Sequence, residues 1–303
     1  MSARRATVFS PAMRIALVVI MAACSGGAHH GASSPDASYD ATVSGLQPKL
    51  PSPTGACPAL ATGDVTFAPA GMPPRKVKLA LDDHATAPGP LVIYWHATYS
   101  SPDEAAYSLG VTEGAITSGG GVVAAPYADP SAGMFEWFIV NGSAKTDDFV
   151  LADEIVACLA AAGRIDPLRV HSMGMSAGAL QTTALGFVRS DYIASVATYS
   201  GGMPDGFSPQ IEDPTNKFAA LIFSGGANDN VFGVDFQAAS DRYRTTLIAS
   251  GHYAEGCDHG QGHQIPLDAA PSVAAFFAAN PYGAWPSPYA TGLPSSFPAY
   301  CAR

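Results

Sequence analysis

The stretch RVHSMGMSAGAL, residues 169–180, decides the fold. A short apolar run meets Gly174-Met175-Ser176-Ala177-Gly178, and helix-forming residues follow. A serine flanked by glycines at a strand–helix junction is typical of a nucleophile elbow, because the turn is strained and neighbouring strands leave no room for a Cβ atom. The alternative is an ordinary serine in a glycine-rich turn. The two interpretations differ in whether the rest of the sequence supplies the surrounding fold, a histidine and an acid.

Strand and helix patterns alternate on both sides of this motif. A continuous apolar run predicts a buried strand over 90–95, and a second buried strand is predicted over 121–125. Further strands are predicted over 169–173, 193–198 and 218–223, and an alternating run predicts an edge hairpin strand over 77–81. Helices are predicted over 103–109, 146–163, 177–189, 234–250 and 272–279. This alternation predicts an α/β fold with a mostly parallel sheet, helices on both faces and a single catalytic domain over 60–303.

The N-terminus carries the features of an export signal over residues 1–23. Arginines 4, 5 and 14 precede an apolar run over 15–23 that is too short to span a bilayer. The sequence Met21-Ala22-Ala23-Cys24 resembles a bacterial lipobox, in which the cysteine is lipidated, although leucine is more usual at the position of Met21. An ordinary cleaved signal with an incidental cysteine is the alternative. Residues 24–59, rich in Gly, Ala, Ser and Pro, are predicted to be a flexible tether. We therefore expect an exported protein that meets the membrane only through a lipid on Cys24.

Composition and cysteine count indicate which partners, disulfides and metal sites to expect. The chain has 303 residues, 13% of them charged, and a net charge of −10, so we expect no nucleic-acid partner. Besides Cys24, an even number of cysteines in an exported chain favours two disulfides with three possible pairings. We prefer Cys57–Cys158 and Cys257–Cys301, and free buried cysteines are the alternative. No Cys or His spacing matches a zinc site, so no metal or cofactor is expected.

A nucleophilic serine needs a histidine base and an acid that orients it, in the chain order serine, acid, histidine. His263 follows two loop glycines that can present its side chain, and His259 in the same loop is the main rival. His252 lies just beyond a predicted helix end, where a capping role is more common.

The acid is expected on a loop after one of the strands that follow the serine. Asp229 fits, because it lies on a tight loop after the strand over 218–223. Asp258 shares the histidine's own loop and has little freedom to reach the imidazole from behind. Asp213, next to a proline, indicates a turn.

An oxyanion hole would complete the site. One backbone N–H is expected from Ala177 and the second from Ala97 or Thr98, on the loop after the strand over 90–95. His96 is interpreted as a structural residue of that loop.

These pieces together resemble the α/β-hydrolase superfamily, and more narrowly the secreted polyhydroxybutyrate depolymerase and feruloyl esterase group. The matching segments are LVIYWHATYSSPDEA, VHSMGMSAGALQTT, SGGANDNV and CDHGQGHQIP, within residues 60–303. The resemblance implies that Ser176, Asp229 and His263 form a triad that hydrolyses esters through an acyl-enzyme. That group usually has glycine at the position of Ala97, so alanine would strain the loop if the glycine has a positive φ.

The substrate is less well defined by the sequence. Tyr99 and Trp137 are candidates to flank an aromatic or polymeric ester, although Trp137 also fits a core position. The leading interpretation is an exported serine esterase, of the polyester depolymerase or feruloyl type. A serine peptidase or amidase with the same triad, and a non-catalytic surface-tethered polymer-binding protein, are the alternatives.

Overall fold

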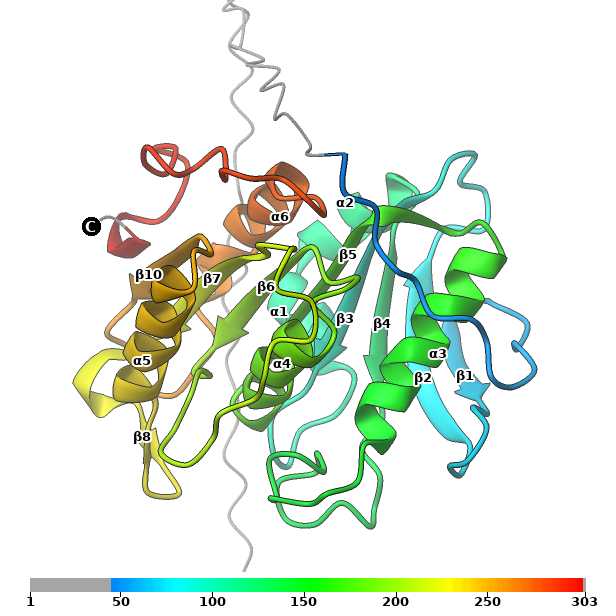
Figure 1. Ribbon diagram of the computed structural model, residues 1–303, viewed down its shortest axis with the longest axis horizontal. Helices are drawn as coiled ribbons and strands as arrows, with labels where there is room; N and C mark the ends of the chain where they lie inside the picture. The colour runs from blue at the N-terminus through cyan, green and yellow to red at the C-terminus, as the bar shows by residue number, and fades with distance from the viewer. Residues whose placement is uncertain (1–44, 302–303) are drawn as a thin grey trace, which may run out of the picture. The chain divides into compact units, whose positions relative to one another are not determined.

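An eight-stranded sheet in the order β1-β2-β4-β3-β5-β6-β7-β10 organises the fold (Figure 1). The computed structural model describes residues 45–301. The predicted export signal, Cys24 and the first part of the predicted tether lie outside these residues. The strands of the sheet are β1 (Gly63–Phe67), β2 (Arg75–Leu81), β3 (Gly89–Trp95), β4 (Val122–Pro126), β5 (Ile165–Met175), β6 (Ser195–Tyr199), β7 (Ala219–Ser224) and β10 (Ala254–Asp258).

The sheet is mostly parallel, as predicted. β2 runs antiparallel to its neighbours β1 and β4, and the other neighbouring pairs run parallel. The predicted hairpin strand over 77–81 is confirmed by the antiparallel pairing of β2 with β1, but its predicted place at the edge is wrong, because β1 pairs along the outer side of β2. At the opposite edge, β10 has the mixed sequence Ala-Glu-Gly-Cys-Asp, which carries no apolar run and was not predicted.

Helices cover both faces of the sheet, so the predicted α/β architecture is confirmed (Figure 1). One apolar core lies between the sheet and α3 (Asp147–Ala161), α4 (Ala177–Val188) and α5 (Phe236–Ala249). A second lies between the other face and α1 (Glu104–Leu109), α2 (Val111–Ser118) and α6 (Ala270–Ala279). A short hairpin, β8 (Asn230–Val231) and β9 (Val234–Asp235), leads into α5. No helix within residues 45–301 has the length and hydropathy needed to cross a membrane.

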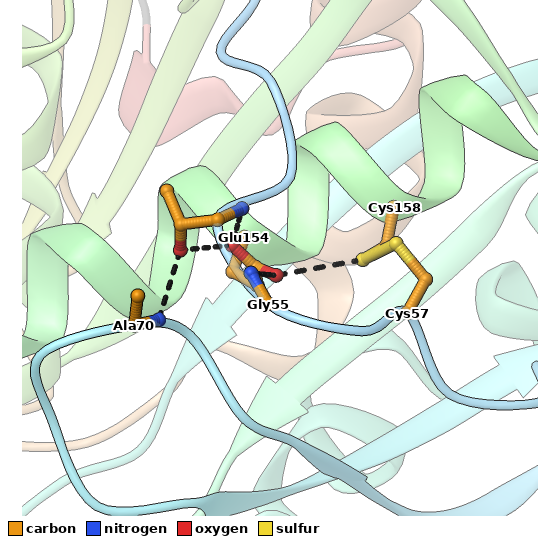
Figure 2. The surroundings of a disulfide bond; sticks show 6 residues. Gly55, Cys57, Ala70, Glu154 and Cys158 are labelled. Carbon is orange, nitrogen blue, oxygen red and sulfur yellow. Dashed lines mark hydrogen bonds between the residues drawn. A yellow bond between two sulfur atoms is a disulfide. The ribbon is translucent and has the colours of Figure 1, made fainter.

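The segment before β1 is attached to the domain, so the prediction of a free tether up to residue 59 is wrong for its last part. Cys57 forms a disulfide with Cys158 of α3 (Figure 2). Glu154 is only 2% exposed, and its carboxylate accepts the backbone N–H and the hydroxyl of Thr54 at 2.8 Å each and the N–H of Gly55 at 2.9 Å. Burial opposes ionisation, but these hydrogen bonds hold the pKa of Glu154 below its ordinary value. Hydrogen bonds and a disulfide hold this segment to the domain. Attachment of this kind needs no apolar pattern, so the sequence of the segment does not predict it.

The preferred cysteine pairing is confirmed. The second disulfide joins Cys257 in β10 to Cys301, 44 residues later. It ties the end of the described chain to the strand that leads into the loop of His263. Each bridge therefore fixes a terminal segment to an element of the central fold.

Candidate active site

Ser176 lies at the turn between β5 and α4 and lines one cavity together with Val231 and Val234 of the β8–β9 hairpin. Its backbone has φ 56° and ψ −120°, a left-handed conformation that is costly for a residue with a Cβ atom. A Cβ on Gly174 or Gly178 would lie 2.5 or 1.9 Å from the carbonyl oxygen of Trp95 in β3. The two glycines are therefore required by the close approach of β3, as the sequence predicts. The connections after β3 and β5 leave toward opposite sides, a position where α/β sheets form their sites.

The structure brings Ser176, His263 and Asp229 together. His263 Nε2 lies 2.9 Å from Ser176 Oγ, and His263 Nδ1 lies 2.7 Å from Asp229 Oδ1. The loops that carry the acid and the histidine touch, because the Gly262 N–H donates to the Gly225 carbonyl oxygen at 2.9 Å. A Cβ on Gly225 would lie 1.9 Å from the Gly262 carbonyl oxygen. This contact holds the two loops side by side.

The surroundings of Asp229 keep it ionised. Asp229 is 1% exposed, and Oδ2 accepts the Ser200 hydroxyl and the Gly225 N–H at 2.8 Å each. Burial alone would raise the pKa of Asp229, but hydrogen bonds from His263, Gly225 and Ser200 hold it below its ordinary value. A carboxylate at Nδ1 fixes the tautomer in which Nδ1 donates and Nε2 accepts the serine proton. The Phe236 ring, 4.7 Å from the His263 ring, packs against the imidazole.

The rival residues are engaged elsewhere. His252 donates to a backbone carbonyl oxygen 3.0 Å away, and His259 accepts a backbone N–H of its own loop at 3.3 Å. Asp258 accepts a backbone N–H two residues on at 3.0 Å. Asp213 does the same at 2.9 Å, which is the turn contact that its sequence predicts.

The oxyanion side of the site differs from the prediction at Ala97. The Ala97 N–H donates to Glu104 Oε1 at 3.0 Å, so it is occupied and the prediction of Ala97 as a donor is wrong. The Tyr99 N–H likewise donates to Glu136 Oε2 at 3.0 Å. Thr98, between them, lines the cavity at Ser176 and is the remaining candidate of this loop. Ala177 is the first residue of α4, so its N–H has no acceptor within the helix.

The predicted strain at Ala97 is also absent, since its φ is not positive. The left-handed residues of the neighbouring loops are instead Tyr99, with φ 64°, and Glu136, with φ 67°. These two residues are joined by the hydrogen bond from the Tyr99 N–H to the Glu136 carboxylate. The strained residue of the loop after β3 is therefore Tyr99, whose N–H is held by the Glu136 carboxylate.

The two aromatic residues proposed to contact substrate differ in position. Trp137 is fully buried, and its Nε1 donates to the His96 carbonyl oxygen at 3.0 Å. Its ring meets that of Trp95 edge-on at 4.9 Å. The prediction that Trp137 binds substrate is therefore wrong: it holds the loop after β3 from inside. Tyr99 is 73% exposed, and its substrate contact stays a prediction.

A cavity of about 520 Å³ opens beside Ser176, Ala177 and Thr98. Its walls come from residues 135–143, 204–209 and 231–236 and are mainly apolar. Phe135 and Phe232 meet edge-on with ring centroids 5.6 Å apart, which joins two of these walls. Asp205 is the single charged residue among those that line the cavity, and it is paired with Arg242 at 2.7 Å. The cavity therefore suits an uncharged, apolar group.

Several residues of the site were not predicted from the sequence. Ser200, with φ 50°, follows β6 and supports Asp229, and the Ser-Gly-Gly that it begins is the one local signal of a tight turn at a strand end. Glu104 and Glu136 hold the loop after β3, but nothing in their sequence surroundings separates them from surface carboxylates. Within residues 45–301, no group of three or more His, Cys, Asp or Glu side chains is arranged to bind a metal ion.

No family model and no curated protein sequence matches this chain. Solved structures do. The fold is similar to that of pOPH, at 17% identity and a TM-score of 0.60, over 76% of this chain and 91% of that one. It is similar to esterase PE8, at 20% identity and a TM-score of 0.53, over 66% of this chain and 96% of that one. It is also similar to an acylaminoacyl peptidase of Pyrococcus horikoshii, at 13% identity and a TM-score of 0.55, over 78% of this chain but 44% of that one. With this sheet, its helices and these neighbours, the chain has the α/β-hydrolase fold, as its sequence predicts.

Proposed function

We propose that this protein is a serine esterase that hydrolyses carboxylic esters through an acyl-enzyme. The observation that carries the proposal is the continuous chain of hydrogen bonds from Ser176 Oγ through His263 to Asp229, at 2.9 and 2.7 Å. It starts at a strained serine beside an apolar cavity. A buried alcohol, an imidazole and an ionised carboxylate in this order are the parts that acyl transfer needs.

In the acylation step, His263 Nε2 accepts the hydroxyl proton while Ser176 Oγ bonds to the ester carbonyl carbon. Asp229 stabilises the imidazolium that forms but does not take its proton. The carbonyl oxygen becomes an oxyanion, which the Ala177 N–H at the start of α4 and the Thr98 N–H would stabilise. When the carbonyl double bond reforms, the C–O bond to the leaving group breaks, and the alcohol departs with the proton from His263.

Deacylation repeats these steps with water as the nucleophile. His263 removes a proton from water as the water oxygen bonds to the acyl carbon. The bond to Ser176 Oγ then breaks, the serine regains its proton from His263 and the acid is released. The net reaction consumes one ester and one water and yields an acid and an alcohol.

The cavity supports an ester whose acyl or alcohol part is apolar and uncharged. Its walls carry phenylalanine, isoleucine and leucine side chains and no cationic group that would pair with a free carboxylate of the substrate. A polyester or a feruloyl-type ester satisfies this condition. Neighbours of this fold include both esterases and an acylaminoacyl peptidase, so ester and amide substrates have to be compared directly.

The test is hydrolysis of p-nitrophenyl butyrate against the matched p-nitroanilide, followed by feruloyl and 3-hydroxybutyrate oligomer esters. We expect turnover of the ester far above the anilide, and loss of that turnover in Ser176→Ala. Preference for the anilide would favour a peptidase. Tight binding of the oligomers by folded protein without hydrolysis of any ester would favour a polymer-binding protein.

We further propose that the protein is exported and lipid-anchored through Cys24. The basic, apolar and small-residue sequence over 1–23 supports export, and two disulfides suit an oxidising compartment. In fractionated bacterial cells, the wild type should sediment with membranes and Cys24→Ser should not. A wild type found free in the medium would refute the anchor.

A further inference from the structure

The tip of the β8–β9 hairpin carries a residue that its turn disfavours. The two strands are joined by Phe232 and Gly233 alone, whose φ values are 54° and 78°. A two-residue hairpin loop with positive φ at both positions usually has the sequence Asn-Gly or Gly-Gly, and a bulky residue at its first position is strained. Phe232 is also 55% exposed, so neither the turn nor burial in the core explains a phenylalanine at this position.

The Phe232 side chain lies at the rim of the cavity beside Ser176. Phe232 lines this cavity and is also more than half exposed, which places it between the cavity and the solvent. Its ring meets the ring of Phe135, from another wall of the cavity, edge-on at 5.6 Å between centroids. Aromatic pairs favour this edge-on arrangement. The two rings therefore form one apolar surface that joins two walls of the cavity.

Hydrogen bonds hold the segments that carry the two rings. At the base of the hairpin, the Phe236 N–H donates to the Asp229 carbonyl oxygen at 2.9 Å, so the hairpin begins and ends beside the triad acid. In the other wall, the Phe135 N–H donates to Asn141 Oδ1 at 3.1 Å. The backbone that carries Phe232 is thus attached to the residue that orients the catalytic histidine.

We propose that Phe232, together with Phe135, is a specificity-determining residue: the two rings bind the apolar group of the ester beyond the reacting carbonyl. The protein would then prefer esters with a large apolar acyl or alcohol part over small ones. This inference rests on the proposed esterase function. Backbone strain of the kind seen at Phe232 often accompanies a ligand contact. A contact remote from the bond that breaks acts mainly on substrate binding, so its loss should raise KM more than it lowers kcat.

The experiment replaces Phe232 by asparagine, which removes the ring and suits the first position of the turn. p-Nitrophenyl acetate and octanoate vary the acyl part, and ethyl and octyl butyrate vary the alcohol part. In one of these two series, the ratio of kcat/KM for the large ester to that for the small ester should fall about 5- to 20-fold, mainly through KM. Phe135→Leu, on the other wall, should lower the same ratio and keeps the test valid if the hairpin variant does not fold.

Two controls accompany this variant. Phe232→Tyr keeps the ring and should keep the ratio within about twofold of the wild type. Tyr107→Asn removes a ring of similar exposure, 61%, that does not line the cavity, and it should leave the ratio unchanged.

Thermal unfolding separates a binding role from a structural one. Because asparagine relieves the strain of the turn, which offsets the lost contact with Phe135, Tm of Phe232→Asn should fall by no more than about 2 °C. A merely structural role would lower Tm further and reduce turnover of small and large esters by the same factor. That result, an unchanged ratio in both series, or a stronger preference for the large ester would overturn the proposal. Failure of the esterase function itself would show differently, as a wild type that hydrolyses none of the four esters.

Discussion

Asp229→Asn is the substitution for which the structure gives the sharpest outcome. Asp229 Oδ2 accepts two hydrogen bonds, from the Ser200 hydroxyl and the Gly225 N–H. The asparagine carbonyl oxygen can keep both only if its NH₂ group turns toward His263 Nδ1, 2.7 Å away in the wild type. That nitrogen then has to accept, so the proton moves to Nε2 and points at Ser176 Oγ. The serine loses its base although every heavy atom stays in place.

We expect kcat for p-nitrophenyl butyrate to fall about 10⁴-fold, which corresponds to about 5 kcal/mol of barrier, as for a triad acid whose amide fixes the wrong tautomer. KM should change little, because the cavity is untouched. Tm should stay close to that of the wild type at neutral pH, since the hydrogen bonds to Ser200 and Gly225 survive.

Ser200→Ala is the matched control, because it removes one of the two hydrogen bonds to Oδ2 and leaves the carboxylate in place. It should cost about tenfold in kcat, or about 1.4 kcal/mol, which is near the low end of the value of a single hydrogen bond to a charged group. Steady-state kinetics and thermal unfolding of both variants provide the measurements. An Asp229→Asn protein that folds and retains kcat within tenfold of the wild type would refute the assignment of Asp229 as the orienting acid.

Three further substitutions test packing and charge. Gly178→Ala places a Cβ atom 1.9 Å from the Trp95 carbonyl oxygen, so we expect loss of activity with about 1–3 kcal/mol or more of lost stability; an alanine variant as active and stable as the wild type contradicts this close approach. Asp148→Asn removes the nearer of the two carboxylates that pair with the buried Arg75 guanidinium, at 2.6 Å, and leaves Asp129 at 3.4 Å; it should cost about 1.5–3 kcal/mol in urea unfolding, and a cost under about 1 kcal/mol would argue against a buried pair. At Asp191, burial raises the pKa to about 6. The destabilisation caused by its ionisation is therefore absent below about pH 4, grows up to about pH 6, and is complete above that pH. Asp191→Asn should therefore exceed the wild type by about 1 kcal/mol at pH 8, allowing for its partial exposure, and match it at pH 4; equal stability at both pH values would refute the shift.

The sheet and the residues that meet at Ser176 could be predicted because they depend on strong local signals. β3 and β7 are buried on both faces and appear as continuous apolar runs. The glycines around Ser176 mark a close approach of backbones, and those around His263 mark a turn. β10 escaped prediction because an edge strand of mixed polarity shows neither an apolar run nor an alternation.

The sequence could not predict which N–H groups of the loop after β3 are already hydrogen-bonded. Glu104 and Glu136 each take one N–H of this loop, and they come from segments 7 and 37 residues away along the chain. Which N–H remains for a ligand depends on those contacts and not on the loop's own residues. The same holds for the segment before β1, which is held by Glu154 and by the Cys57 disulfide.

The most direct test of the central claim is covalent labelling of the folded protein with a fluorophosphonate, read by mass spectrometry of the intact chain and its peptides. The account predicts one adduct per chain, located on Ser176, absent in Ser176→Ala and formed far more slowly in His263→Ala. An unlabelled wild type of native Tm, or an adduct on another serine, would contradict it.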